Sequence, residues 1–150
     1  MARAPEVTFY LLSQANEQAW LAQVCALVTA QFSQRRKVAI RARSQEQAES
    51  IDELLWQQPT DRFIPHNLVG EGPAGGAPVV IGWDQPAEAF GYGRQVVINL
   101  ANDSAPFLRG TQHIIDFVPA QDEDKELARE RFRNYRRSGA NIETVPLQQD

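Results

Sequence analysis

The side chains best suited to chemistry lie near the end of the chain, where cations repeat at a helical spacing. Lys125, Arg129 and Arg133 recur at intervals of four residues, with Phe132 and Arg136 beside them, so a helix would carry them along one face. Guanidinium groups bind carboxylates through paired hydrogen bonds, and an apolar notch among them would accept a ring. The pattern therefore suits a peptide that ends in acidic and aromatic residues.

A structural role for the same charges is also open. Acidic residues at 122–126 precede basic residues at 129–137, an order that complements the dipole of a helix. Arg131 and Tyr135 are among the residues that compete for the inward face of this helix, and Tyr135 is expected in the core. The spacing alone leaves both interpretations standing.

A second candidate surface is aromatic and lies near the middle of the chain. It comprises Trp56, Arg62, Phe63, Pro65 and Leu68, which crowd around the point where a helix is expected to end. Exposed aromatic patches near loops mark sites for protein partners. Closure of a sheet edge would explain the same residues, so this interpretation also stays open.

A small nucleotide-binding enzyme is the alternative from another functional class. The glycine-rich loop Gly70–Gly76 has the composition of a phosphate-binding loop, but it precedes a strand and no Lys-Ser or Lys-Thr pair follows it. His66 and Glu71 resemble an acid-base pair, yet nothing supplies the rest of a catalytic site. His66 and His113 match no metal motif in their spacing. We therefore predict no catalytic residue, no metal and no cofactor.

Composition narrows the class of protein further. The 150 residues suit one domain, and the net charge of −4 opposes direct wrapping of nucleic acid, so we expect little direct nucleic acid binding. Cys25 is the single cysteine, so an intrachain disulfide is excluded. No signal peptide and no long apolar run are present, which predicts a cytoplasmic protein that does not enter a membrane.

Strands alternate with helices along the chain. We predict strands at 6–12, 37–42, 79–83, 95–100 and 113–118, an edge strand or extended segment at 63–68, and helices at 17–32, 44–56 and 122–138. This order predicts a single α/β domain over residues 1–139, a three-layer sandwich with a mainly parallel sheet. Only a loop separates 79–83 from 95–100, which leaves room for one antiparallel pair and hence a mixed sheet. Residues 140–150 are expected to form a loosely held tail.

Taken together, these segments resemble the chi subunit of the bacterial DNA polymerase III holoenzyme almost from end to end. The similar segments are residues 7–12 (VTFYLL), 51–56 (IDELLW), 63–68 (FIPHNL), 70–73 (GEGP), 75–79 (GGAPV), 116–119 (DFVP), 127–132 (LARERF) and 135–136 (YR). The resemblance implies a mononucleotide-fold-like α/β protein without bound nucleotide. It also implies a non-catalytic bridging role in the clamp-loader complex, between the psi subunit and the acidic, Phe-terminated tail of single-stranded DNA-binding protein.

The resemblance also assigns residues to each partner. By position, the tail-binding residues fall on Val118, Lys125, Arg129, Phe132 and Arg133, which are largely the residues that the charge spacing indicates. Phe132 and Arg133 stand where Tyr and Lys are common in the family, so ring and charge are kept but a phenolic hydrogen bond is lost.

The psi-binding residues fall on Trp56, Phe63 and Pro65. The resemblance admits a repair helicase as another occupant of that surface.

Overall fold

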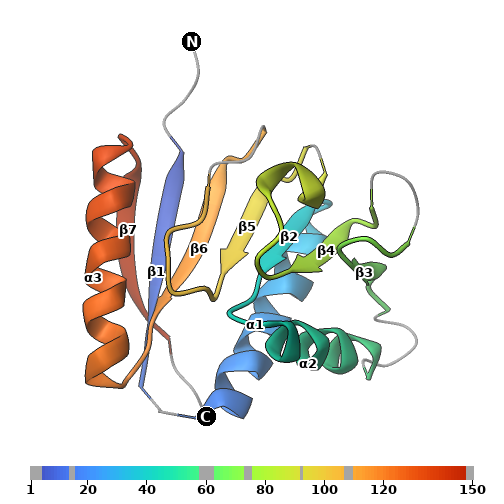
Figure 1. Ribbon diagram of the computed structural model, residues 1–150, viewed down its shortest axis with the longest axis horizontal. Helices are drawn as coiled ribbons and strands as arrows, with labels where there is room; N and C mark the ends of the chain where they lie inside the picture. Colours follow the sequence, from blue (N-terminus) through green and yellow to red (C-terminus); the bar gives the residue numbers. More distant parts are fainter. Residues whose placement is uncertain are drawn as a thin grey trace.

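Seven parallel strands form the centre of the computed structural model, which describes residues 5–13, 16–57, 63–72, 76–91, 93–106 and 110–147. The strands are β1 (Glu6–Leu12), β2 (Val38–Arg41), β3 (His66–Leu68), β4 (Val79–Gly82), β5 (Val96–Asn99), β6 (His113–Val118) and β7 (Asn141–Leu147). They lie in the order β3-β4-β2-β5-β6-β1-β7 (Figure 1). β3 and β7 are therefore the two edges of the sheet.

Three α-helices cover the sheet: α1 (Glu17–Ser33), α2 (Gln45–Trp56) and α3 (Asp122–Arg137). Alternate side chains of the strands enter two separate cores, because successive residues of a strand point to opposite faces. Val38 and Ile40 of β2 pack in the core that contains α1 and α2 residues, whereas Ala39 packs in the core that contains Tyr135 of α3. The predicted three-layer α/β sandwich is thereby confirmed.

The helices begin where local chemistry favours a beginning. The side chain of Ser44 accepts a hydrogen bond from the Gln47 backbone N–H at 3.1 Å and so caps α2, at the residue where the predicted helix begins. Asn16 caps α1 in the same way through the Ala19 N–H. α3 has acidic residues in its first turn and Arg136 and Arg137 in its last, as the dipole favours.

The structure excludes the mixed sheet that the sequence left open, and it corrects the tail predicted at 140–150. β2 lies between β4 and β5 and is parallel to both, so the segments at 79–83 and 95–100 do not form an antiparallel pair. Asn141–Leu147, placed in a loosely held tail at 140–150, forms β7 and pairs with β1 along seven residues. Proline is tolerated in an edge strand, which is how Pro146 can lie within β7. Residues 148–150, like Pro59 and Arg62, lie outside the described residues.

Candidate functional site

A small hollow lies between α3 and the strands β1, β6 and β7, and it collects most of the residues predicted to bind an acidic tail. Its volume is about 160 Å³. Its lining residues are Phe9, Val118, Lys125, Ala128, Arg129, Phe132 and Thr144. Four of the five predicted residues are among them. The fifth, Arg133, is exposed on α3 one residue after Phe132 and does not line the hollow.

Aromatic and aliphatic groups form the floor of this hollow. The ring centroids of Phe9 and Phe132 are 5.8 Å apart and their planes are tilted by 42°. Phe9 is fully buried, whereas Phe132 is half-buried and keeps part of its ring towards solvent. Aromatic rings at this distance attract a further ring in a tilted arrangement. The hollow can therefore take an aromatic or branched apolar side chain.

Two cations stand at the rim, each paired with an acid on its own helix. Lys125 Nζ lies 3.8 Å from Asp122 Oδ1, and Arg129 pairs with Glu126. The cationic side chains remain 45% and 64% exposed, and pairs three residues apart on a helix contribute only about 0.2–0.5 kcal/mol. Both cations are thus available to the carboxylates of a bound partner.

A buried polar network fixes α3 from its inner side. Arg131 Nε donates to both carboxylate oxygens of Asp116 at 3.2 Å, and Arg131 Nη2 donates to the Phe117 carbonyl at 2.9 Å. The Tyr135 hydroxyl donates to Asp116 Oδ2 at 2.8 Å and accepts from the Ala105 N–H at 2.9 Å. Burial raises the pKa of Asp116, and the Arg131 charge and these donors act against that rise.

Sequence reasoning placed Tyr135 in the core correctly but did not single out Asp116. The signal was present, because Asp116 interrupts the apolar run HIIDFV of a buried strand. A lone acid in such a run requires a buried cationic or hydrogen-bonding partner. Arg131 supplies it, and the network thereby holds the helix that carries Lys125 and Arg129.

The second predicted surface lies at the other edge of the sheet, beside β3 (Figure 1). Trp56 and Phe63 are 56% and 47% exposed, and their ring centroids are 5.4 Å apart. Pro65 is half-buried two residues after Phe63, so the structure brings the three predicted residues into one patch. Leu68 instead packs partly against the core.

The buried His66 packs against the ring of Trp56 in this patch. Its ring lies 4.8 Å from that of Trp56, its Nδ1 lies 2.7 Å from the Ile64 carbonyl oxygen, and its Nε2 lies 3.2 Å from Asp52 Oδ1. Burial and the neighbouring acids on α2 raise the pKa of Asp52, while His66 opposes them. The acid within ion-pair distance of His66 is therefore Asp52 of α2, whereas the sequence had suggested Glu71.

The glycine-rich loop joins β3 to β4 and leads into no helix, as its position in the sequence indicated. Residues 73–75 of this loop lie outside the described residues. Behind Gly76 lies the buried Arg94, whose guanidinium donates to the carbonyl oxygens of Ala77, Pro78 and Phe90. The described part of the loop is thus packed against a structural arginine.

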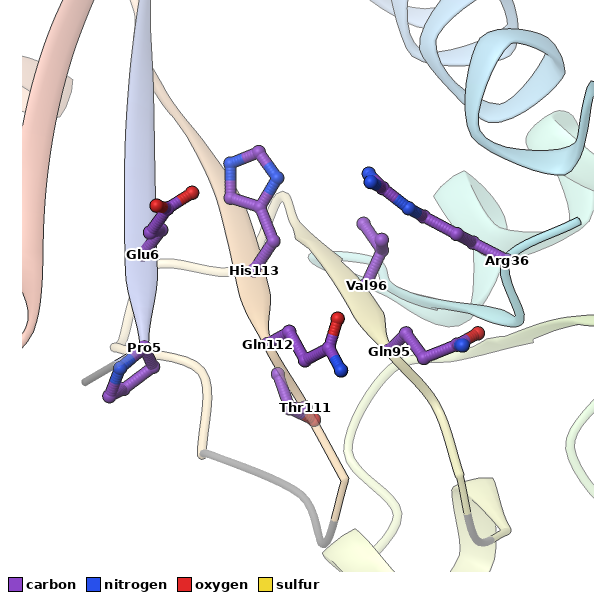
Figure 2. Close-up of a pocket in the computed structure, with 8 residues that line it drawn as sticks. All are labelled: Pro5, Glu6, Arg36, Gln95, Val96, Thr111, Gln112 and His113. Atoms are coloured by element: carbon purple, nitrogen blue, oxygen red, sulfur yellow. The ribbon is translucent and has the colours of Figure 1, made fainter. Parts of the chain in front are cut away.

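A larger hollow, of about 380 Å³, opens at the amino ends of β1, β5 and β6 (Figure 2). The polar groups of Glu6, His113 and Arg36 project on the same side of the sheet there (Figure 2). His113 Nε2 lies 2.8 Å from Thr8 Oγ1. Ligands of open α/β sheets are held at the carboxyl ends of the strands, so this hollow lies at the end opposite to that rule.

Burial is the main influence on the titration of His113, and it lowers the pKa of the imidazole. The Arg36 charge lowers it further, whereas Glu6 and Glu143 raise it.

None of the helices formed by the described residues is long and apolar enough to cross a membrane.

Comparison with known proteins decides the family. The model of the family described as "DNA polymerase III chi subunit, HolC" matches residues 4–143. The chain belongs to the chi subunit family. A relative from Escherichia coli K12, named DNA polymerase III subunit chi, is 39% identical over 142 residues, covering 92% of this chain and 95% of the relative. Relatives of the same name from Haemophilus influenzae and Pseudomonas aeruginosa are 35% and 29% identical, covering 94% and 89% of this chain and 96% and 90% of their own lengths.

Membership of the chi family confirms the resemblance seen in the sequence segments. It makes the chain an accessory subunit of DNA replication, because the relatives are named as subunits of DNA polymerase III. The fold is the α/β sandwich with parallel strands that the order of strands and helices predicted.

Proposed function

We propose that this chi-family protein is a non-catalytic subunit of the clamp-loader complex of DNA polymerase III and works in the cytoplasm. In this proposal it bridges the psi subunit and the acidic C-terminal tail of single-stranded DNA-binding protein. The observation that carries the proposal is the hollow under α3, where an apolar floor and a cationic rim coincide.

The hollow matches a peptide that ends in acidic residues and phenylalanine. The terminal ring enters between Phe9 and Phe132, and the carboxylates lie against Lys125 and Arg129. Arg133 adds a third exposed positive charge beside the hollow. Lys125, Arg129 and Arg133 place positive charge beside the hollow on a chain whose net charge is −4, which favours docking of an acidic tail at this site.

Psi is the partner that we assign to the surface of Trp56, Phe63 and Pro65. Two exposed rings in mutual contact form the kind of anchor that dominates protein interfaces. A repair helicase is the other occupant of this surface. Since the surface lies at the β3 edge and the hollow at the β7 side, both partners can be held at once.

A peptide titration tests the tail-binding site. A fluorescent peptide ending in acidic residues, proline and phenylalanine should bind the wild type and weaken as salt rises. Arg129→Ala should weaken binding roughly ten- to a hundredfold, since a hydrogen bond to a charged group contributes about 1.5–3 kcal/mol. Arg133→Ala should weaken it less. Arg137→Ala, an exposed arginine in the last turn of α3, is the matched control. Unchanged binding in both Arg129→Ala and Arg133→Ala would remove the site assignment.

Co-purification with psi tests the other surface. Trp56→Ala should lose psi and keep the peptide, and Arg129→Ala should do the reverse. If Trp56→Ala and Phe63→Ala both retain psi, the partner lies elsewhere on the chain.

A further inference from the structure

Leu11 is an exposed apolar side chain that neither proposed interface uses. It is 38% exposed and, among the residues that the structure describes, shares this status with only Trp56 and Phe63. A single exposed leucine is ordinary on a protein surface. The residues beside Leu11 in the sheet, however, connect it with the hollow.

The register of the sheet places Leu11 next to the hollow. In β1, Phe9 and Leu11 point to the same face, and Phe9 lines the hollow. Leu11 is opposite Val118 of β6 and Pro146 of β7. Val118 also lines the hollow, and Pro146 is exposed. Leu11, Val118 and Pro146 therefore form an apolar shelf, continuous with the hollow on the side of the strands' carboxyl ends.

The spacing of this shelf matches that of an extended peptide. Phe9 and Leu11 are two residues apart on one strand, a repeat of about 6.6 Å. In an extended peptide, side chains two residues apart also share a face at this repeat. When a terminal ring lies over Phe9, the side chain two positions before it lies over Leu11.

We propose that Leu11 selects the third-from-last residue of the bound tail and requires it to be apolar. This inference rests on the proposed function and deepens it. The terminal ring occupies the hollow, the third-from-last side chain covers Leu11 and Pro146, and Lys125 is left for the acidic residues that precede them. The shelf thus distinguishes an acidic tail with an apolar residue at this position from one that is acidic throughout.

The test is a double-variant cycle with two six-residue peptides. One ends in Leu-Pro-Phe after acidic residues, and the other has Gln in place of that Leu. Wild type should bind the Leu peptide roughly five to ten times more tightly, as expected for burying part of one aliphatic side chain. Leu11→Gln should bring this ratio close to one, and Leu11→Met should keep it. Ala26→Gln, which alters an exposed residue of α1 on the other face of the sheet, should leave the ratio unchanged.

The possible results separate this inference from the proposed function. If wild type binds both peptides equally, or if Leu11→Gln keeps the preference, the role of Leu11 is overturned while tail binding stands. If wild type binds neither peptide, the proposed tail site fails and the inference fails with it. Urea unfolding of Leu11→Gln and of Leu11→Met is the control that tests whether each variant is folded.

Discussion

Replacing Arg131 by methionine should destabilise the protein strongly, although the substitution keeps most of the side-chain volume. Arg131 is 3% exposed and donates to the buried carboxylate of Asp116 and to the carbonyl oxygens of Phe117 and Asn102. Removing one partner of a buried ion pair costs about 3–5 kcal/mol, because the other charge is left uncompensated. For a chain of this size that corresponds to a fall in Tm of roughly 6–20 °C.

Urea unfolding followed by circular dichroism measures this loss. Arg129→Met is the matched control, since Arg129 lies on the same helix with most of its side chain in solvent, and its effect should stay below about 0.5 kcal/mol. The double variant Asp116→Asn/Arg131→Met should recover part of the stability, because no charge remains at this buried site and the amide oxygen can still accept from Tyr135. A loss below about 1 kcal/mol for Arg131→Met would refute the view that this pair fixes α3.

Three further predictions concern other parts of the molecule. The pKa of His113 is lowered in the folded state, so its contribution to the free energy of unfolding is present above pH 6.5 and is lost as pH falls. The loss is at most about 1.4 kcal/mol per pH unit. His113→Gln should reduce this pH dependence of the free energy of unfolding, measured with urea between pH 7.5 and 5.5. Gly76→Ala should lower the melting temperature more than Gly139→Ala does. Both glycines have positive φ, but a Cβ at Gly76 would lie 2.7 Å from Arg94 Nη2, whereas one at Gly139 would have no atom within 4 Å. Equal falls in melting temperature would contradict this. Ser44→Ala should cost about 0.5–2 kcal/mol through loss of the α2 cap, which chemical denaturation would detect.

The sequence predicted the elements of the fold better than the pairing between them. The periodicity of apolar residues located α1 and α2 because that signal is local to each helix. β7 was missed because its Pro-containing segment acquires a strand conformation only by pairing with β1, a contact far along the chain. Phe9 and Thr144 enter the candidate site through that same long-range pairing.

The spacing of the cations predicted the site only in part. A helix turns about 100° per residue, so each four-residue step shifts a side chain by about 40° around the axis. Lys125 and Arg133 are therefore about 80° apart, which explains why Lys125 lines the hollow and Arg133 does not. Identical charges at regular spacing thus differ in their distance from the apolar floor.

The breadth of the sheet has a consequence for how two partners would be arranged. Six spacings of about 4.8 Å separate β3 from β7, which sets the edge strands roughly 29 Å apart. Partners bound at the two edges, as proposed above, would therefore lie at a separation set by the number of strands between them. The number of strands thus determines the distance between the two edge strands, because each added or removed strand changes that distance by about 4.8 Å.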